Sequence, residues 1–337
     1  MAIKKVPLGK DGPLVPALGF GMMGLSYAYG EPPSDEERFK ILDRALALGN
    51  IFWDTADLYG DSEILLKKWF QRTGKRDQIF LADKFGFVKG KQIADVDSSA
   101  TYCKQACNAS LEALGIDVID LYYCHSCNPE TPIEETMRAL VELQKEGKIR
   151  YIGLSSVSSA TLRRAVKIAP VTAVQTEYSV ISREIEGPEG TDLLATCREL
   201  GVAVVVAMPL GRGLITPTFT AGNTPLNDVR QRLPRFQEEN REKNMETLRR
   251  FGAIAAKKGC TPSQLALAWL LKQGDDIIPI PGTKTLKYVD ENWASLDVVL
   301  SDEDEKEVRA FAEASPMAGS SVPPAFGSYL FRDTKEE

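Results

Sequence analysis

Residues 118–125 read VIDLYYCH, an apolar run that ends directly in His125, the only histidine among the 337 residues. Two earlier runs end in the same way: residues 50–53, NIFW, lead into Asp54, and residues 79–83, IFLAD, lead into Lys84. Short apolar runs bounded by turn or helix signals are typical of buried parallel strands, and in an α/β barrel the carboxyl ends of such strands face the active site. We therefore expect Asp54, Lys84 and His125 to lie close together.

Segments typical of strands and helices alternate along the chain. A capping box at residues 34–37, SDEE, begins one helix, and Gly49 ends it. Strands are predicted near 17–22, 51–54, 79–84, 118–125, 150–155, 171–177, 202–208 and 277–281. Helices are predicted near 34–48, 62–72, 98–114, 133–146, 158–168, 190–200, 240–258, 262–273 and 285–295. Because such alternation gives right-handed crossovers and a parallel sheet, and eight units close on themselves, the sequence predicts an α/β fold, the (β/α)8 TIM barrel.

The two ends of the chain differ from this pattern. Residues 4–15, with Lys10-Asp11-Gly12 at their middle, are typical of a β-hairpin laid across the barrel floor. The segment from Ser315 onward is rich in Gly, Pro and Ser, which is typical of a loop over the surface or the site mouth. Its aromatic residues either line a substrate pocket or anchor the tail to the surface; they are Phe326, Tyr329 and Phe331. We predict one barrel domain over 1–337, with the hairpin in 1–16 and the tail in 315–337.

Composition narrows the class of protein. The chain is 43% hydrophobic and 26% charged, with a mean hydropathy of -0.19, as expected of a globular protein. The net charge of -6 and the pI near 5.2 argue against binding to nucleic acid or to an anionic membrane. No apolar segment is long enough to span a membrane, and the first residues lack the apolar core of a signal peptide. The sequence predicts a cytoplasmic protein whose partner is a small molecule.

Two motifs are misleading. Residues 19–24, GFGMMG, match the dinucleotide-binding pattern G-x-G-x-x-G, which requires a helix to begin at the third glycine. Residues 25–33 contain Gly30, Pro32 and Pro33, so we expect no helix there and reject a Rossmann unit.

The cysteine spacing is the second misleading motif. Cys103-x3-Cys107 followed by Cys124-x2-Cys127 resembles a zinc site. Cys103 and Cys107 share an apolar helical stripe with Leu111, so core packing explains them and we predict no metal. Cys127 is either a reactive thiol or, as we favour, an inert one.

A tyrosine completes the predicted chemistry. Tyr59 lies five residues after Asp54, and a loop folded over the strand ends would bring its phenol beside Lys84. An ammonium group favours the phenolate, so we expect Lys84 to lower the pKa of Tyr59 from its ordinary value of about 10. With Asp54 paired to Lys84 and His125 bonded to a substrate oxygen, the four residues would form a proton donor for a developing alkoxide.

Five segments together are similar to the motifs of the aldo-keto reductase family, in that family's order. They are residues 54–60 (DTADLYG), 84–86 (KFG), 120–125 (DLYYCH), 147–155 (GKIRYIGLS) and 280–284 (IPGTK). The resemblance extends from about residue 16 to 300 and is nearest to the NADP-dependent fungal, bacterial and plant reductases of the yakC type. It implies reduction of aldehydes or ketones with NADPH, with Tyr59 as proton donor and Asp54, Lys84 and His125 completing the catalytic tetrad.

The same resemblance implies a site for NADP(H). Its residues would be Gly21, Met22, Ser155, Ser156, Gln175, Leu210, Arg212, Gly213, Thr283, Lys284, Glu291 and Asn292. Within this set, Ser155 and Gln175 match residues at the nicotinamide amide, and Leu210 and Arg212 match the loop beside the pyrophosphate. Thr283 and Lys284 match the 2′-phosphate segment, and a lysine and a hydroxyl before a helix suit a phosphate. Glu291 and Asn292 match residues at the adenine.

The chain departs from the family's pattern in two places. The family usually has Tyr-Ser before Pro-Leu-Gly, with the tyrosine stacked on the nicotinamide, whereas this chain has Ala207-Met208. The family's glycine-containing loop after Gly213 is replaced by residues 214–220, LITPTFT. We expect these two changes to affect the binding of the cofactor.

Two other classes of function are compatible with these residues. A lysine at a barrel strand end can form a Schiff base, which would make Lys84 the nucleophile of a lyase. Relatives of the fold also include non-catalytic, nucleotide-sensing channel subunits, and the missing ring at Ala207 would suit such a role. Borohydride trapping distinguishes the first alternative, and NADPH consumption distinguishes the second.

Overall fold

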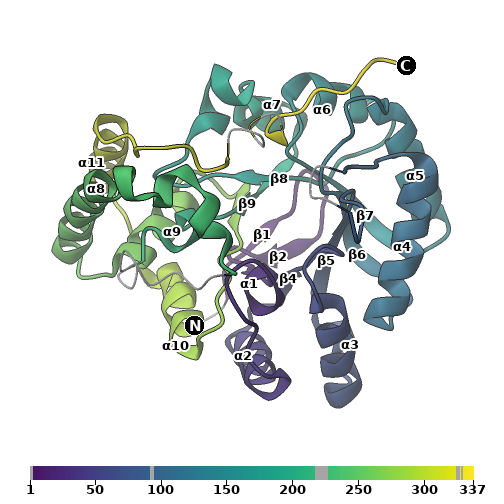
Figure 1. Cartoon of the computed structure of the whole chain (residues 1–337), viewed down its shortest axis with the longest axis horizontal. Helices are drawn as coiled ribbons and strands as arrows, with labels where there is room; N and C mark the ends of the chain where they lie inside the picture. The colour runs from purple at the N-terminus through teal and green to yellow at the C-terminus, as the bar shows by residue number, and fades with distance from the viewer. Residues whose placement is uncertain (1–2, 92–94, 217–226, 324–326, 328) are drawn as a thin grey trace.

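A closed parallel barrel forms the centre of the molecule. The computed structural model describes residues 3–91, 95–216, 227–323, 327 and 329–337. Among these residues, eight parallel strands pair in the order β10-β9-β8-β7-β6-β5-β4-β3 (Figure 1). The strands are β3 Phe20–Gly21, β4 Phe52–Asp54, β5 Phe80–Phe85, β6 Ile119–Cys124, β7 Ile149–Ser155, β8 Ala173–Glu177, β9 Ala203–Ala207 and β10 Ile277–Pro279. Gly19 N donates to Pro279 O at 2.9 Å, which joins the first strand to the last, so the predicted (β/α)8 barrel is confirmed.

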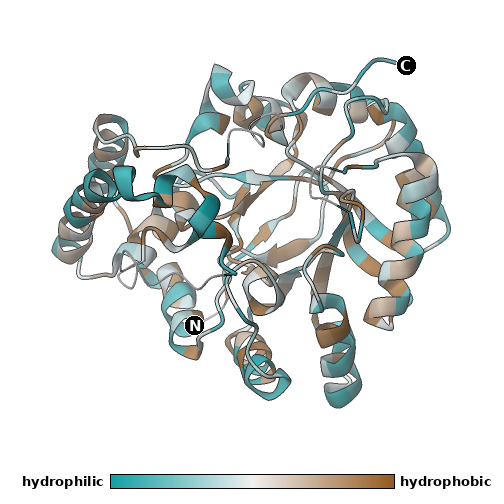
Figure 2. Ribbon diagram, in the orientation of Figure 1, coloured by the Kyte–Doolittle hydropathy of each residue, from teal (hydrophilic) through white to brown (hydrophobic). Residues whose placement is uncertain are grey.

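Helices surround the barrel wall (Figure 1). They are α1 Met23–Ser26, α2 Asp35–Leu48, α3 Ser62–Thr73, α4 Ala100–Leu114, α5 Ile133–Lys145, α6 Ser159–Ala165, α7 Leu193–Leu200, α8 Glu238–Lys257, α9 Pro262–Lys272, α10 Leu286–Trp293 and α11 Asp302–Ala314. The capping box predicted for α2 forms between Ser34 and Glu37, and Gly49 ends that helix with a φ of 84°. Figure 2 shows apolar residues on the strands and polar residues on the outer helix faces.

Alternating strand positions divide the core into two parts. Residues whose side chains point into the barrel are buried and either aliphatic or aromatic, among them Phe52, Ala82, Leu121, Tyr123 and Val205. The intervening strand residues pack against the helices in the larger cluster. Since side chains alternate with a period of two, the inward row that includes Phe52 and Ala82 continues at Asp54 and Lys84. The barrel interior therefore ends in polar side chains at its carboxyl end.

The predicted hairpin closes the opposite end of the barrel. Strands β1 Lys5–Pro7 and β2 Leu14–Pro16 pair antiparallel, and Asp11 adopts a φ of 62° in the turn. Val6, Leu8 and Val15 are buried in the same cluster as the inward-facing residues of the barrel. Apolar packing thus fixes the hairpin across the barrel floor.

The helices differ from prediction in three respects. Helix α11 was not predicted, although Ser301 and Asp304 form a capping box at its start. A single helical turn, α1, begins at Met23, so the expectation of no helix after the glycines was wrong for its first residues. The turn ends at Ser26, and β3 and α1 belong to the barrel rather than to a Rossmann unit. Helix α7 begins at Leu193 rather than near 190, because residues 188–190 form a separate 3-10 turn.

The described residues include no helix that is both long and apolar enough to span a membrane. Cys103 and Cys107 lie on the side of α4 that packs into the apolar core. Burial raises the pKa of the Cys107 thiol to about 12. The Sγ atoms of Cys124 and Cys127 lie 3.7 Å apart and are both buried.

Candidate active site

Lys84 is the centre of the polar group at the carboxyl end of the barrel. Its Nζ donates to Asp54 Oδ1 at 2.6 Å, to the Thr55 carbonyl oxygen at 2.5 Å and to the Tyr59 hydroxyl at 3.4 Å. The side chain is 0% exposed, so these contacts take the place of water. An ammonium group has three protons, and each has an acceptor here.

Electrostatics keep Lys84 protonated. Burial lowers the pKa of Lys84, but the negative charge of Asp54 and its hydrogen bond outweigh burial, and the pKa is raised above its ordinary value. The described geometry therefore presents a fixed positive charge beside the Tyr59 hydroxyl.

The Tyr59 ring is held on several sides. Lys84 Nζ lies 4.8 Å from the ring centroid, the Tyr27 ring stacks at 6.4 Å, and the His125 ring meets Tyr59 edge-on at 5.8 Å. Burial raises the pKa of Tyr59, and Lys84 lowers it by less than burial raises it. The prediction that Lys84 would bring this pKa below its ordinary value was wrong for the net direction, because sequence patterns do not show how fully the phenol is desolvated.

His125 is held neutral at the edge of the same group. Its backbone N donates to Phe85 O at 2.7 Å, and its ring packs edge-on against Phe87 at 4.9 Å. Burial, together with the positive charge of Lys84, lowers the pKa of His125 well below its ordinary value. Nδ1 is buried and has no hydrogen-bond partner among the described residues. A neutral imidazole in this position can donate one hydrogen bond to a substrate oxygen.

Asp54 is also held from the opposite side of the barrel. Gln175 Nε2 on β8 donates to Asp54 Oδ2 at 2.7 Å. Sequence reasoning placed Gln175 at the nicotinamide amide and missed this bond, since β4 and β8 are far apart in sequence. With its amide nitrogen used by Asp54, Gln175 can offer a ligand its carbonyl oxygen.

A cavity of about 360 Å³ leads outward from the polar group, a size typical of small-molecule sites. Asp54, Tyr59 and Gln175 line its inner end, whereas Lys84 and His125 are not part of the lining. Seven further residues of the predicted cofactor set line it: Gly21, Met22, Leu210, Arg212, Gly213, Thr283 and Lys284.

Four residues of the predicted cofactor set are not in the lining of this cavity. Ser155 is buried beside Gln175 in the strand register, and Ser156 N donates to Gln175 O at 3.0 Å. Glu291 Oε1 accepts from Thr261 Oγ1 at 2.9 Å at the start of α9, and Asn292 is buried.

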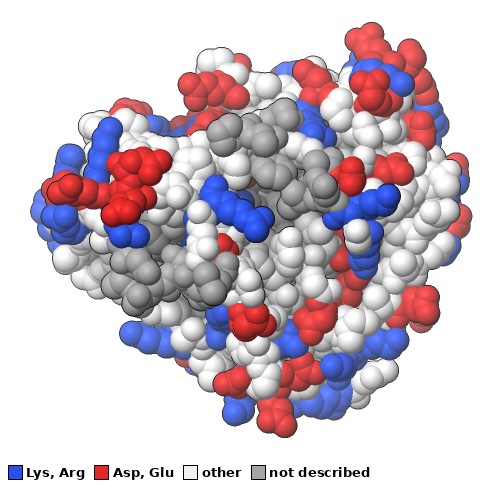
Figure 3. All heavy atoms as spheres, in the orientation of Figure 1, with Lys and Arg blue, Asp and Glu red and all other residues white. Residues whose placement is uncertain are grey.

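The outer end of the cavity is basic. Arg212, Arg230 and Lys284 all line it, and basic side chains lie beside a hollow near the middle of the face in Figure 3. Lys284 Nζ donates to Tyr29 O at 2.7 Å and to Glu31 O at 3.3 Å. Three cations together with the hydroxyls of Thr283 and Thr285 suit a phosphate-bearing dinucleotide.

The sequence did not predict the part of the rim that residues 228–230 form. Val229 N donates to Ala28 O at 2.8 Å, and Arg230 forms an ion pair with the buried Asp228 at 2.6 Å. The Arg230 guanidinium also lies 5.2 Å from the Tyr29 ring centroid. No motif marked residues 227–230, because the pairing with residues 28–31 joins segments about 200 residues apart.

Comparison with known proteins is consistent with this arrangement. The model of the aldo/keto reductase family matches residues 17–313. This chain belongs to the aldo/keto reductase family. The protein named aldo-keto reductase yakC [NADP(+)] from Schizosaccharomyces pombe is 46% identical over 339 residues, which covers 99% of this chain and 98% of that protein. A probable aldo-keto reductase from Glycine max is 42% identical over 318 residues, covering 94% and 90% of the two chains.

Solved structures of other aldo-keto reductases have the same fold. A glycerol dehydrogenase from Gluconobacter oxydans matches with a TM-score of 0.81 at 26% identity, covering 94% of this chain and 97% of that one. The holo form of an aldo-keto reductase from Bacillus halodurans matches with a TM-score of 0.74 at 28% identity, covering 96% and 98%.

In this aldo-keto reductase, residues with non-aromatic side chains line the cavity where β9 ends. Ala207 lines the cavity with a methyl group, and Met208 follows with a φ of 53°. Of the replaced loop, Leu214 and Ile215 are buried, Thr216 lines the cavity, and residues 217–220 lie outside the described residues.

Two of the three tail aromatics can be placed in this aldo-keto reductase. Phe331 packs against the core, and the Arg332 guanidinium lies 3.7 Å from the Tyr329 ring centroid. Neither aromatic lines the cavity, and Phe326 is outside the described residues.

Proposed function

We propose that this aldo-keto reductase reduces an aldehyde or a ketone to an alcohol and that Tyr59 donates the proton. NADPH, when bound in the cavity, supplies the hydride. The observation that carries the proposal is that one buried ammonium group, Lys84, contacts both Asp54 and the Tyr59 hydroxyl. Asp54 and Tyr59 border the cavity while Lys84 stays buried behind them, so a substrate meets the phenol and not the amine.

Each member of the tetrad then has a distinct task. His125, being neutral, donates a hydrogen bond to the substrate carbonyl oxygen and orients it toward Tyr59. As negative charge develops on that oxygen, the Tyr59 hydroxyl gives up its proton to it. The Lys84 ammonium stabilises the phenolate that remains, and Asp54 holds the ammonium in place.

NADPH rather than NADH is the cofactor that these residues favour. Thr283 and Lys284 line the basic end of the cavity directly before α10, where a 2′-phosphate would find a cation and a hydroxyl. The Schizosaccharomyces pombe relative, which is named as NADP(+)-dependent, supports the same choice. We also propose that residues 1–337 act as one domain. We further propose that the protein is cytoplasmic, which cell fractionation would test.

The Schiff-base alternative conflicts with the environment of Lys84. A nucleophilic amine must be unprotonated and must reach the substrate. Lys84 is fully buried, its raised pKa keeps it protonated, and its protons are directed at three oxygens.

The test is NADPH consumption with a panel of aromatic and aliphatic aldehydes, ketones and pyridoxal, with identification of the alcohol product. Turnover with at least one carbonyl compound is expected. Tight NADPH binding with no turnover across the panel would contradict the proposal and favour a nucleotide sensor. Substrate trapped on the protein by borohydride, absent from a Lys84→Met variant, would instead support a lyase.

A further inference from the structure

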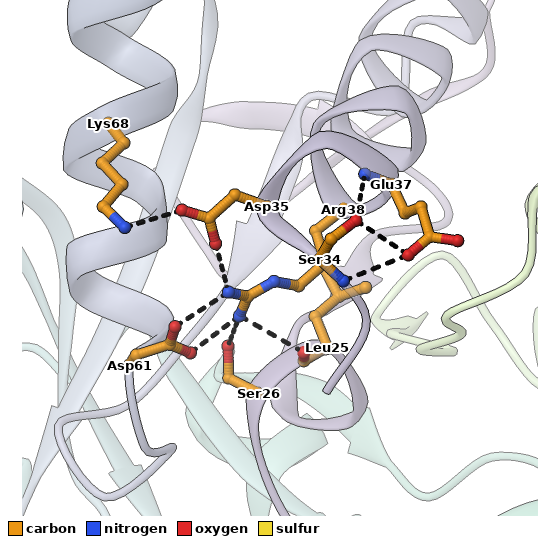
Figure 4. Close-up of polar contacts among 8 residues, drawn as sticks. All are labelled: Leu25, Ser26, Ser34, Asp35, Glu37, Arg38, Asp61 and Lys68. Atoms are coloured by element: carbon orange, nitrogen blue, oxygen red, sulfur yellow. Dashed lines mark hydrogen bonds and ion pairs between the residues drawn. The ribbon is translucent and has the colours of Figure 1, made fainter. Parts of the chain in front are cut away.

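Arg38 on α2 is a buried cation outside the tetrad. Figure 4 shows its guanidinium between Asp61, Asp35, Ser26 and Leu25. Nη1 and Nη2 donate to the two carboxylate oxygens of Asp61 at 2.7 and 2.8 Å, and Nη1 also donates to Ser26 Oγ at 2.9 Å. Nη2 forms a further short contact with Asp35. The Arg38 side chain is only 5% exposed.

The partners of Arg38 belong to the two segments that flank Tyr59. Asp61 lies two residues after Tyr59, at the end of the loop 55–61 that carries the phenol. Ser26 is the last residue of α1, and the next residue, Tyr27, stacks its ring on Tyr59. A single guanidinium therefore links the loop of Tyr59 to the turn that packs against it.

Backbone packing makes this link a tight one. Gly60 adopts a φ of 57°, and a Cβ atom there would lie 2.6 Å from the carbonyl oxygen of Ser26. The loop 55–61 is therefore in close contact with α1 at the residue between Tyr59 and Asp61. A shift of α1 toward the loop would therefore push against the backbone next to Tyr59.

The other end of the loop is fixed to the barrel. Thr55 N donates to Ala82 O at 2.9 Å and Asp57 N donates to Lys84 O at 3.1 Å, and both acceptors lie on β5. Arg38 holds the end of the loop at Asp61 to helix α2. The phenol oxygen, 3.4 Å from Lys84 Nζ, lies between these two attachments.

We propose that Arg38 is a positioning residue for the proton donor: its fork-shaped contact with Asp61 and its bond to Ser26 set the place of Tyr59 relative to Lys84. This inference rests on the proposed function of Tyr59. A planar guanidinium can hold both oxygens of one carboxylate and still reach a third acceptor, which a lysine ammonium does with poorer directional control.

A second ion pair on the same helix provides the matched control. Arg44 pairs with Asp290 at 2.6 Å, and both side chains are about half exposed. That pair joins α2 to α10, away from the loop of Tyr59. Loss of Arg44 therefore tests what losing an α2 ion pair does without disturbing Tyr59.

The experiment is a double-mutant cycle of Arg38→Met and Tyr59→Phe, with Arg44→Met as control. In the wild-type background we expect Arg38→Met to lower kcat by roughly tenfold, because misplacing a reacting group is costly. In the Tyr59→Phe background we expect a further change of less than about twofold, since residues that act through each other are non-additive. Arg44→Met is expected to leave kcat unchanged in both backgrounds.

If the double variant is too slow to measure, the pH dependence of kcat in the single variant provides a second test. If Tyr59 moves away from Lys84, the ammonium lowers the phenol pKa less, so the basic limb of the kcat profile should shift to higher pH in Arg38→Met. Arg38→Lys, which keeps the charge, covers the case in which Arg38→Met does not fold, and it should give an intermediate kcat. Guanidinium ion added to Arg38→Ala at non-denaturing concentration should partly restore kcat.

The outcomes are separable. If Arg38→Met lowers kcat by the same factor with and without the Tyr59 hydroxyl, and the pH profile is unmoved, the positioning role is overturned. If Tyr59→Phe itself keeps the wild-type kcat, the proposed function fails, and with it the inference. If Tyr59→Phe is inactive while Arg38→Met and Arg38→Lys match the wild type, only the role of Arg38 is overturned.

Discussion

Gln175 donates its side-chain nitrogen to Asp54 Oδ2 at 2.7 Å, while Lys84 occupies Oδ1 at 2.6 Å. The carboxylate is thus held by β5 on one side and by β8 across the barrel on the other. Both oxygens accept hydrogen bonds within the protein, so the carboxyl group that anchors Lys84 is in position before a substrate enters. Such preorganisation lowers the cost of stabilising charge in the transition state.

Removal of the Tyr59 hydroxyl should abolish most carbonyl reduction. We expect Tyr59→Phe to lower kcat by about a hundredfold to ten-thousandfold, the usual contribution of general acid catalysis. NADPH binding should change little, because the ring remains in place. Steady-state kinetics and a fluorescence titration of NADPH measure the two effects. Tyr151→Phe, at the amino end of the barrel beside Phe80, is the control, and a Tyr59→Phe variant with most of the wild-type kcat would refute the assignment.

Lys284→Ala should reduce the preference for NADPH. A charge-assisted hydrogen bond to phosphate contributes about 1.5 to 3 kcal/mol, so NADPH affinity should fall by about tenfold or more. Because Lys284 also holds the carbonyls of Tyr29 and Glu31, we expect a smaller loss for NADH. Parallel fluorescence titrations of both cofactors give the ratio, and Lys287→Ala serves as the neighbouring control. Equal losses for the two cofactors would show that Lys284 supports the rim and does not contact the 2′-phosphate.

Ala207→Tyr tests whether an aromatic ring at the end of β9 contacts the cofactor. An aromatic contact is worth roughly 0.5 to 1.5 kcal/mol, so Ala207→Tyr should tighten NADPH binding by up to about tenfold if the ring fits. If Met208 or another side chain already fills the space, overpacking should instead destabilise the fold by about 1 to 3 kcal/mol. NADPH titration and thermal melting of the variant distinguish these results. A variant unchanged in both respects would mean that position 207 does not face the nicotinamide.

Asp57 should make stability depend on pH. Burial raises the pKa of this carboxyl to about 7, far above its value of about 3.9 in an unfolded chain. Since the folded form holds the proton more tightly, the penalty for ionising Asp57 grows as the pH rises from about 4 to about 7 and is constant above that range. Asp57→Asn removes the penalty and should raise the free energy of unfolding at pH 8 by about 4 kcal/mol relative to its effect at pH 4, because each pKa unit corresponds to about 1.4 kcal/mol.

Thermal melts of Asp57→Asn between pH 4 and pH 8.5 measure this dependence. Asp117→Asn, which makes the same replacement at an exposed position, is the control. A stabilisation by Asp57→Asn of the same size at every pH would mean that Asp57 titrates normally in the folded protein.

Local patterns in the sequence predicted much of the fold and part of the candidate site. The runs before Asp54 and Lys84 were predictable as strands because period and length are local properties, and parallel strands bring their carboxyl ends to one edge. Helix α11 was missed because residues 302–307 at its start are all charged. The buried apolar residues of the helix, Val308, Phe311 and Ala312, come only after them.

Properties that depend on cross-barrel distances were not predictable. The Gln175–Asp54 bond depends on the register between distant strands, and the rim formed by Val229 and Ala28 joins two irregular segments. Burial raises the pKa of Tyr59 and the charge of Lys84 lowers it, so the net shift depends on how completely the phenol is buried. The order of residues does not show this degree of burial.

Closure of the barrel has a consequence for how the chain acquires its structure. The bond from Gly19 to Pro279 joins the first strand to the last, and Val6 and Leu8 are buried against residues as late as Ile278 and Ile280. The cluster that buries Val6 and Leu8 is therefore complete only when residues 277–280 have joined the barrel. Such long-range pairing slows folding and leaves early segments exposed to aggregation. The hairpin should be the last element to gain protection from hydrogen exchange during refolding.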